Sequence, residues 1–263
     1  MKKLKLIGPY KDYGRPDMWD DNSNIICYAD IGIRQVSEYN DKQVALLIEP
    51  RSIQENIYDL IERNYMYFKY VFTHDDKLLN TLPNAKPIIW GGVWCRSDEK
   101  KTKLISMTSS DKEACELHKV RKRIAQRFKN DIDVYGTIDG GKYTDPIDTL
   151  KEYKYNVVIE NYINDLWFTE KILNCFATKT IPIYLGSKAI GNYFNKNSII
   201  ICENEESVAE AIKNILEHEN EYDKFYNDNI DAINENYELS KNYENFETMF
   251  YNTYEKELNE LFK

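Results

Sequence analysis

The stretch VVIENYINDLWFTEKILNCFATKTIPIYLGS, residues 157–187, decides the fold. An apolar run ends in the polar pair Glu160 and Asn161, a loop follows, and a helical pattern starts near Thr169. A second β-rich run then covers residues 180–186. The order strand, helix, strand predicts two parallel strands joined by a crossover helix. Ligands bind beyond the carboxyl ends of such strands, so the residues just after each strand are the first candidates for a site.

The same alternation extends in both directions along the chain. Ten runs are typical of strands: 3–8, 24–30, 43–49, 70–75, 86–92, 103–108, 132–137, 155–161, 180–186 and 198–204. Four segments have helical patterns: 53–66, 111–128, 169–177 and 206–217. This alternation predicts an α/β protein with parallel sheets, followed by helices alone beyond position 205.

A chain of 263 residues is long enough for one large domain or two small ones. The polar run SDEKKTK, residues 97–103, separates two series of strands, and we interpret it as an interdomain linker. We therefore expect a first domain over 1–98, a second over 99–238 and a helical tail over 239–263. In that tail, the near-helical spacing of Phe246, Phe250, Tyr254 and Leu258 predicts an apolar face that packs on another element.

The net charge is −9, from 35 Lys and Arg against 44 Asp and Glu, which argues against nucleic acid or anionic lipid as a partner. The acidic surplus lies in the residues from 201 onward. Between Lys112 and Lys129, in contrast, seven basic residues accompany only Glu113 and Glu116. The longest apolar runs are far below the roughly 20 residues that span a bilayer, so no membrane segment is expected.

The amino-terminal sequence and the pattern of cysteines indicate the cellular compartment of the protein. The start, MKKLKLIGPYKDYG, resembles a signal peptide, but Lys5 and Gly8 interrupt its apolar stretch, and a first strand is the better interpretation. The cysteines are odd in number and scattered, at Cys27, Cys95, Cys115, Cys175 and Cys202. This pattern is typical of free thiols in a reducing compartment, so we expect a cytoplasmic protein.

Thr169, Glu170 and Lys171 admit two interpretations. In the plainer one, Thr169 caps the helix, Glu170 interacts favourably with the helix dipole, and Lys171 is a solvated cation. However, a cation in the first turn opposes the dipole unless an anion lies nearby. A nucleotide diphosphate would supply that anion.

Three segments together resemble a known motif. They are I-E-N at 159–161, W-F-T-E-K-I at 167–172 and T-I-P-I-Y-L-G-S at 180–187. This pattern is similar to the donor-binding motif of the alpha-1,3-fucosyltransferases, glycosyltransferase family ten. The similarity covers roughly residues 43–218 and is most specific over 155–187.

The resemblance implies a GT-B fold, with two Rossmann-like domains facing a cleft and a nucleotide sugar, usually GDP-fucose, held by the second. It implies inverting transfer to a glycan acceptor without a covalent intermediate. Separately, we expect that the reaction needs no divalent metal or other cofactor. The terminal helix would pack back on the first domain. The eukaryotic members' amino-terminal anchor has no counterpart here, which points to a short bacterial or viral type; the oligomeric state stays open.

The resemblance also assigns donor-binding residues. Arg121 aligns with the family's phosphate-binding arginine, whose fork can bind a diphosphate in a bidentate manner. Its neighbours Arg123 and Arg127 are alternatives, and a solvated basic face is the plainer interpretation of all three.

In the central motif, the resemblance implies that Glu170 binds ribose hydroxyls and that Lys171 lies beside the phosphates. Asn161 and Trp167 match positions that contact the donor. Trp167 stands where the family usually has Tyr, so an aromatic surface is kept and a hydroxyl is lost. The loop before it lacks the family's glycines, which leaves the transferred sugar open.

Glu49 is the best candidate for the general base, by resemblance to a glutamate in the family's G-E-N sequence. Here the sequence is I-E-P, with Ile48 and Pro50 as departures. A carboxylate at a strand end suits base catalysis if burial raises its pKa. Asp75 and Glu160 are the alternatives.

Two acidic motifs could suggest a metal. Asp131 and Asp133 form a D-x-D pattern, but it begins a predicted strand, away from the carboxyl end. His74 is followed by Asp75 and Asp76, with no second ligand in register. We expect no metal at either place. The competing functions are a GT-B transferase that uses another nucleotide sugar, a degenerate nucleotide-sugar-binding protein, and a periplasmic-type sugar-binding protein.

Overall fold

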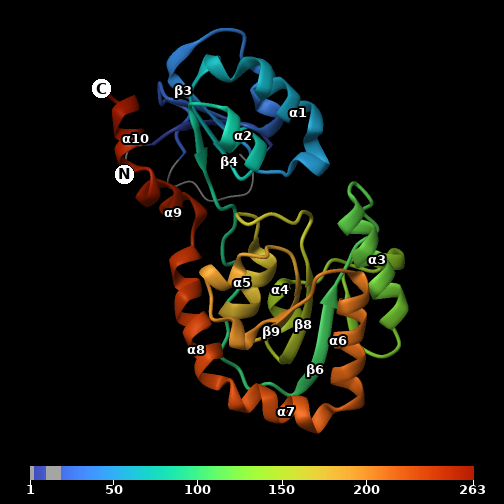
Figure 1. The fold of residues 1–263 in the computed structure, drawn as a ribbon. Coiled ribbons are helices and arrows are strands. Elements are labelled where there is room, and N and C mark those ends of the chain that lie inside the picture. Colours follow the sequence, from blue (N-terminus) through green and yellow to red (C-terminus); the bar gives the residue numbers. More distant parts are fainter. Residues whose placement is uncertain (1–2, 10–18) are drawn as a thin grey trace. The chain divides into compact units, whose positions relative to one another are not determined.

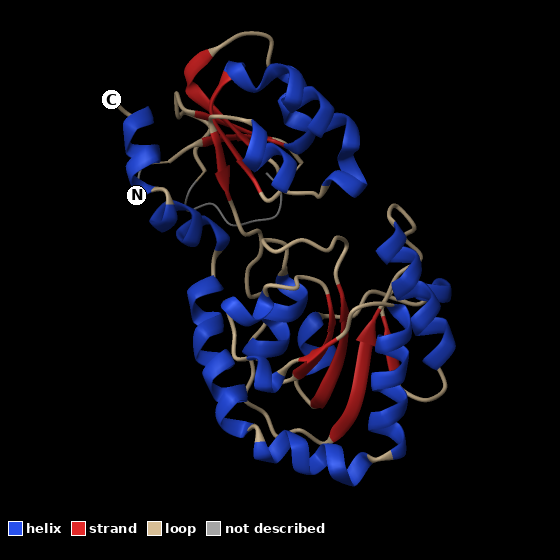
Figure 2. Cartoon of the chain, in the orientation of Figure 1, coloured by secondary structure: helices blue, strands red, loops and turns tan. Residues whose placement is uncertain are grey.

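The computed structural model describes residues 3–9 and 19–263, and these form two compact units. Unit 1 comprises Met1–Trp90 with Asn245–Lys263, and unit 2 comprises Gly91–Glu244 (Figure 1). Each unit contains a five-stranded sheet with helices against it (Figure 2). All strand pairs are parallel, so the predicted α/β architecture with two parallel sheets is confirmed. Residues 1–2 and 10–18 of the expected first domain lie outside the described residues.

The sheet of unit 1 follows the order of the chain. Its strands are β1 (Lys5–Ile7), β2 (Ile26–Ala29), β3 (Asn40–Leu46), β4 (Phe68–Thr73) and β5 (Ala85–Pro87), paired in that order. Its helices are α1 (Arg51–Asn64), α2 (Asp76–Thr81), α9 (Phe246–Thr253) and α10 (Glu255–Leu261), with short 3₁₀ turns at Asp30–Gln35 and Tyr65–Tyr67.

Alternating side chains of β3 bury both faces of this sheet. Ala45 packs in one cluster with Tyr58 and other residues of α1, whereas Val44 and Leu46 pack in a second cluster with the apolar face of α9 and α10. Phe250 of α9 meets Phe72 edge to face at 4.7 Å between ring centroids. The carboxyl-terminal helices are thus the second layer over this sheet, and their buried aromatic stripe is the reason.

The sheet of unit 2 has the order β10-β9-β8-β6-β7. Its strands are β6 (Lys103–Thr108), β7 (Asp133–Tyr135), β8 (Tyr153–Ile159), β9 (Ile181–Leu185) and β10 (Ile200–Ile201). Its helices are α3 (Glu116–Phe128), α4 (Pro146–Leu150), α5 (Glu170–Ala177), α6 (Glu205–Glu217), α7 (Glu219–Asp228) and α8 (Ile230–Leu239). Short 3₁₀ turns cover Ile138–Gly140, Ile190–Asn192, Lys196–Ser198 and Ser240–Tyr243. The expected helix over 169–177 begins one residue later, because Thr169 is its N-cap.

The boundaries of the two units differ from the expected ones at both crossings. The chain enters unit 2 at Gly91, before the polar run, because Trp94 N and Cys95 N both donate to Asn174 Oδ1, at 2.8 and 3.3 Å. It leaves unit 2 after Glu244, later than the expected position 239. There Tyr243 packs its ring against Phe168. Both boundaries are set by contacts between residues that are distant in sequence. The position of a polar run in the sequence does not predict such contacts.

The expected and observed elements differ most at short strands. The runs 132–137 and 198–204 are strands only over Asp133–Tyr135 and Ile200–Ile201. The helix expected over 111–128 begins at Glu116, and residues 109–115 form a loop at the carboxyl end of β6. None of the described helices is both long and apolar enough to cross a bilayer.

Candidate functional site

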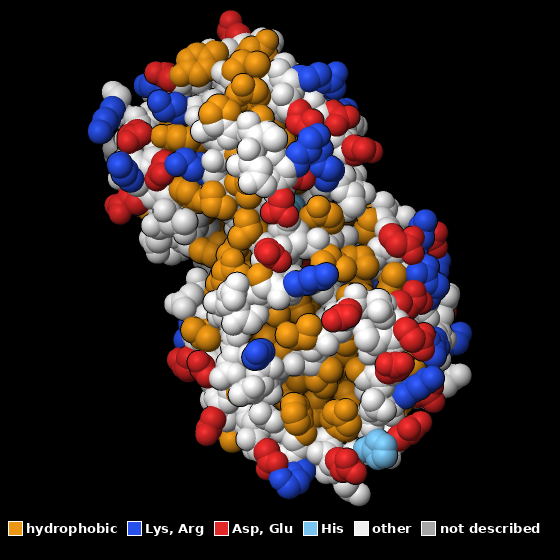
Figure 3. All heavy atoms as spheres, in the orientation of Figure 1, with side chains coloured by type: hydrophobic (Ala, Val, Ile, Leu, Met, Phe, Trp, Pro, Cys, Tyr) orange, Lys and Arg blue, Asp and Glu red, His pale blue; other side chains and the backbone are white. Residues whose placement is uncertain are grey.

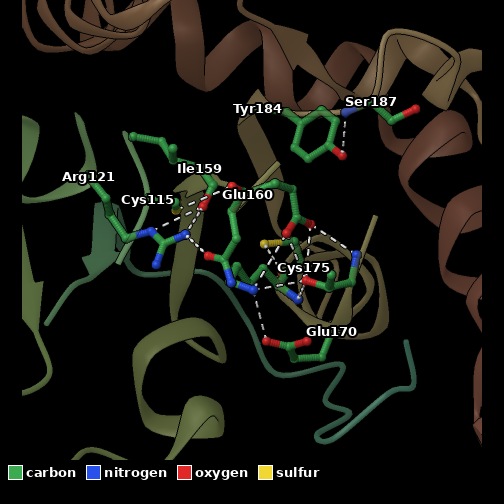
Figure 4. A network of polar contacts seen from close by, with 11 residues as sticks. Cys115, Arg121, Ile159, Glu160, Glu170, Cys175, Tyr184 and Ser187 are labelled. Carbon is green, nitrogen blue, oxygen red and sulfur yellow. Dashed lines mark hydrogen bonds and ion pairs between the residues drawn. The ribbon is translucent and has the colours of Figure 1, made fainter. Parts of the chain in front are cut away.

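The carboxyl end of β8 is the centre of a polar network in unit 2 (Figure 4). β8 ends at Ile159, and Glu160 and Asn161 follow it directly. Side chains from α3 and from the first turn of α5 approach this strand end. Because β6, β8 and β9 are parallel, their carboxyl ends lie at one edge of the sheet, where α/β proteins bind ligands.

Glu160 is a buried carboxylate that fixes the start of α5. Its side chain is 0% exposed, and its oxygens accept hydrogen bonds from Thr169 N at 2.9 Å and from Thr169 Oγ1 at 2.9 and 3.1 Å. Thr169 Oγ1 in turn caps the helix by accepting from Lys171 N. Burial raises the pKa of Glu160, and the charge of Lys171 opposes that rise. Glu160 is therefore turned toward the helix start and orders the residues that follow.

Lys171 is a cation held in place by two carboxylates. Its Nζ lies 3.1 Å from Glu170 Oε1 and 3.5 Å from Glu160 Oε2, and it donates to Thr169 Oγ1 at 3.0 Å. Burial favours the neutral amine, but Glu170 and Glu160 outweigh burial, and the pKa of Lys171 is raised. The side chain is 26% exposed, so the network does not enclose it completely. The two carboxylates account for a cation in a first turn, where the helix dipole disfavours one.

Arg121 reaches the same strand end from α3. Its Nε donates to the Ile159 carbonyl at 3.0 Å, and its Nη2 donates to the same carbonyl and to Asn161 Oδ1 at 2.8 Å. Among the described residues, Nη1 has no hydrogen-bond partner. Burial lowers the pKa of Arg121, although a guanidinium stays charged at any pH of interest. Cys115, the N-cap of α3, donates its thiol to the Asn161 carbonyl at 3.3 Å.

The network can bind an anion. Arg121 and Lys171 present fixed cations at one strand end, and Figure 4 shows Glu160 between Arg121 and the first turn of α5. Hydrogen bonds within the protein already order both cations, so little side-chain entropy is lost when an anion binds. Preorganised cations of this kind stabilise the negative charge of a phosphate or of a leaving diphosphate.

Arg123 and Arg127, the two alternatives to Arg121, are engaged elsewhere. Arg123 is exposed and binds Glu205 through three contacts of 2.7–3.1 Å, as well as Glu116 at 3.0 Å. Arg127 lies 3.4 Å from Glu206. These pairs tie α3 to the first turn of α6. Of the three arginines, Arg121 alone contacts the end of β8 in the described part of the chain.

Trp167 does not present the aromatic surface that we expected. Its side chain is 2% exposed, in the core beside the fully buried Phe168. A contact between this ring and a donor stays a prediction. Asn161, in contrast, lies at the strand end as expected and bonds to Arg121.

Glu49 lies in unit 1, three residues after the end of β3, and is half-buried. Its backbone N donates to Asp30 Oδ2 at 3.1 Å, and its carbonyl accepts from Tyr58 Oη at 2.8 Å. Asp30 also accepts from Ile48 N at 2.8 Å and is itself buried, with a left-handed φ of 44°. We did not predict a role for Asp30 from the sequence. It is nevertheless the last residue of the predicted strand 24–30, and residues at strand ends were the first candidates for a site.

Asp75, the alternative base in unit 1, has other partners. Its carboxylate accepts two hydrogen bonds of 2.9 Å from Arg51 and caps α2 by accepting from Leu78 N at 2.9 Å. Burial raises its pKa, but Arg51 and the cap outweigh burial, and the pKa is lowered. A lowered pKa weakens a general base. Burial lowers the pKa of the adjacent His74 to about 3, so this histidine is neutral near pH 7.

The acidic motifs that could suggest a metal have structural partners. Asp133 Oδ2 accepts from Tyr153 Oη at 2.6 Å at the start of β7, away from the carboxyl edge. Within residues 3–9 and 19–263, no three His, Cys, Asp or Glu side chains gather as metal ligands would.

The fold defines an α/β protein of the GT-B class, and two cations, Arg121 and Lys171, lie at the sheet edge of its second unit. A model of glycosyltransferase family 10 (fucosyltransferase), C-terminal part, matches residues 98–252. The match covers more than half of the chain, and the chain belongs to this family.

Individual relatives agree with this assignment. The chain is 33% identical over 88 residues to the alpha-(1,3)-fucosyltransferase FucT of Helicobacter pylori, and 34% identical over 102 residues to protein R654 of Acanthamoeba polyphaga mimivirus. These alignments cover 32% and 38% of this chain, but only 18% and 17% of the two relatives. The crystal structure of an alpha1,3-fucosyltransferase with GDP has the same fold, with a TM-score of 0.56, 17% identity, and coverage of 92% of this chain and 80% of that one.

Proposed function

We propose that this protein is a glycosyltransferase that transfers L-fucose, or a related sugar, from a GDP-sugar to a glycan hydroxyl with inversion. One observation supports this most: Arg121, Asn161 and Lys171, three residues that match the family motif, belong to one network at the end of β8. The Helicobacter pylori relative is an alpha-(1,3)-fucosyltransferase, which supports the transferred sugar. The similar crystal structure contains GDP, which supports the carrier.

The donor residues have distinct tasks in this proposal. Arg121 Nη1 and Lys171 Nζ bind the diphosphate and stabilise its charge as it leaves. Glu170 Oε1 is paired with Lys171, and Oε2, which has no hydrogen-bond partner among the described residues, accepts from ribose hydroxyls. Asn161 and Glu160 position the two cations. Because these cations neutralise the leaving diphosphate, we propose that no divalent metal is required.

Glu49 is the proposed general base. It takes the proton of the acceptor hydroxyl as that oxygen forms a bond to the anomeric carbon, while the bond from this carbon to the diphosphate breaks. A single displacement of this kind inverts the configuration and needs no covalent intermediate with the protein. The five free cysteines support a cytoplasmic location.

A thermal-shift panel with GDP, UDP and CMP, each alone and as its sugar conjugates, tests the donor. A ligand at 100 times its Kd stabilises by about 2.7 kcal/mol. Since 1 kcal/mol shifts the Tm by about 2–4 °C for a chain of this size, the expected rise in Tm is about 5–11 °C. We expect GDP and its sugars to raise the Tm and the others not to. A response to UDP-sugars alone would favour the competing transferase, and no response to any nucleotide would overturn the proposal.

Two arginine variants on α3 form a matched pair for this panel. Arg121→Ala removes the cation at the strand end and should weaken GDP binding by tenfold or more, since charge-assisted hydrogen bonds contribute about 1.5–3 kcal/mol each. Arg123→Ala removes an exposed arginine that pairs with Glu205 and should leave GDP binding unchanged. Equal losses in the two variants would contradict the role of Arg121.

A further inference from the structure

Asp30 is a buried carboxylate in a strained backbone conformation at the carboxyl edge of the sheet of unit 1. It directly follows β2, is 1% exposed and has a left-handed φ of 44°. Among the described residues other than glycine, Asp139 and Lys179 also have a left-handed φ, and neither of them is buried. Strained residues persist where the surrounding structure holds them, and they cluster at functional sites.

The Asp30 side chain extends the hydrogen bonding of the sheet beyond the end of β2. All four residues of β2 pair with β3, and the chain then leaves the sheet in the 3₁₀ turn Asp30–Gln35. Past the end of β3, the carboxylate accepts two successive backbone N–H groups: Oδ1 from Ile48 N at 2.8 Å and Oδ2 from Glu49 N at 3.1 Å. Both oxygens of Asp30 therefore hold the segment that carries the proposed base.

Glu49 is held from its other side by α1. Its carbonyl accepts from Tyr58 Oη at 2.8 Å, and Tyr58 is 0% exposed. Pro50 follows and disfavours a helical backbone at Glu49. With both the N–H and the carbonyl of Glu49 bonded, the side-chain torsions are the main freedom that this residue keeps.

We propose that Asp30 is a positioning residue for the general base: its two hydrogen bonds hold the backbone of Glu49 so that the Glu49 carboxylate meets the acceptor hydroxyl. This inference rests on the proposed function, and Tyr58 adds the support from the carbonyl side. A base must lie within hydrogen-bond reach of the proton that it takes, and a displacement of about 1 Å can lower a rate about 100-fold.

The measured rate is the release of GDP from GDP-fucose, with N-acetyllactosamine as the acceptor probe and, in a second series, with water alone. In both series a hydroxyl must lose a proton to a base, so both report on Glu49. Each variant is assayed well below its own Tm, so that loss of folded protein does not lower kcat. Calorimetry gives the affinity for GDP-fucose.

Asp30→Asn tests the role with little change in shape. Asparagine also tolerates a left-handed φ, but its Nδ2 cannot accept, so one of the two N–H groups loses its acceptor. We expect kcat to fall about tenfold, the effect of one lost hydrogen bond, and the affinity for GDP-fucose to stay unchanged. Asp41→Asn, at an exposed position near the amino end of β3, is the matched control and should keep the wild-type kcat. A wild-type kcat in Asp30→Asn would overturn the proposal.

The double variant with both Asp30→Asn and Glu49→Gln separates positioning of the base from a general structural effect. Without a base at position 49, the exact place of its backbone no longer matters for proton transfer. Asp30→Asn should therefore lower the residual kcat of Glu49→Gln no further. An equal tenfold loss in the presence and absence of the Glu49 carboxylate would show that Asp30 acts only on the fold, and would overturn the proposal.

Tyr58→Phe removes the support from the carbonyl side and keeps a test available if Asp30→Asn does not fold. The ring that packs against Arg51, 4.6 Å from the guanidinium carbon, is retained and only the hydroxyl is lost. We expect kcat to fall about threefold to tenfold, with unchanged GDP-fucose affinity and no further loss in Glu49→Gln. A wild-type kcat in Tyr58→Phe would show that the Glu49 backbone need not be held, and would contradict the inference.

The same measurements distinguish failure of the inference from failure of the proposed function. If the wild-type protein releases no GDP in either series, or if Glu49→Gln releases it at the wild-type rate, the proposed reaction or its base fails and the inference fails with it. If Glu49→Gln is impaired while Asp30→Asn and Tyr58→Phe keep the wild-type kcat, only the inference fails.

Discussion

Two carboxylates that follow strands, Glu49 and Glu160, have different surroundings. Glu160 is fully buried and accepts hydrogen bonds from Thr169 with both oxygens, so it orders the start of α5. Glu49 is half-buried, and its backbone is held on two sides, by Asp30 and by Tyr58. A braced backbone limits where the Glu49 side chain can reach, which suits a group that must meet a substrate hydroxyl.

The substitution Glu49→Gln tests whether this single residue is the general base. The variant keeps the size and polarity of the side chain but removes its basicity, so we expect unchanged GDP-sugar binding and a loss of transfer of about 100-fold or more. Binding is measured by calorimetry and transfer by the release of GDP. Glu55→Gln, an exposed position on α1, is the control. An active Glu49→Gln protein would assign the base elsewhere.

Asp75 gives a pH prediction in the same unit. Its pKa is lowered when folded, so its contribution to stability is present above the unfolded pKa of about 3.9 and is lost as the pH falls through the folded pKa. Asp75→Asn keeps the cap of α2 but loses the charge beside Arg51, and should cost about 1–3 kcal/mol at pH 7.

This cost should shrink as the pH is lowered from 7 to 3, because Asp75 takes up a proton in the unfolded chain before it does so in the folded protein, where its pKa is lowered. Urea unfolding at several pH values measures it, with the exposed Asp59→Asn on α1 as the control. A difference that is constant between pH 7 and pH 3 would show that the charge of Asp75 does not matter for stability.

At the scale of elements, the two ends of the chain form one core. The helices α9 and α10 cover one face of a sheet whose strands come from the first 90 residues. The periodicity of Phe246, Phe250, Tyr254 and Leu258 predicted a buried face, and each of these residues is buried. Their spacing did not predict which sheet they cover. A helical period identifies the buried face of a helix, but it does not identify the element against which that face packs.

Phe250→Ala tests this packing. Phe250 is 1% exposed and meets both Phe72 and Tyr254, so its truncation should leave a cavity and cost about 3–5 kcal/mol. Urea unfolding followed by tryptophan fluorescence and circular dichroism measures the loss. Asn252→Ala, at an exposed position of the same helix, should change stability by less than about 0.5 kcal/mol. A similarly small loss for Phe250→Ala would show that α9 does not stabilise unit 1.

At the scale of the whole molecule, ion pairs between distant segments change the interpretation of the net charge and of the local basic excess. The sequence has a local basic excess between Lys112 and Lys129, but Arg123 and Arg127 pair with Glu205 and Glu206 of α6, within the acidic part of the chain. Figure 3 shows basic and acidic side chains intermixed over this part of unit 2. Arg121 forms no ion pair among the described residues, so no direct carboxylate partner neutralises its charge at the strand end.

The sequence by itself determined the α/β class, the helix start at Thr169 and the position of Glu160 and Asn161 at a strand end. These features follow from hydrophobic periodicity and capping, which depend on residues close together in the chain. It did not determine the unit boundaries, which of the three arginines of α3 contacts the end of β8, the burial of Trp167, or the partners of Asp30 and Glu160. The tertiary structure decided these, because burial and ion pairing depend on residues that folding brings together from far apart in sequence.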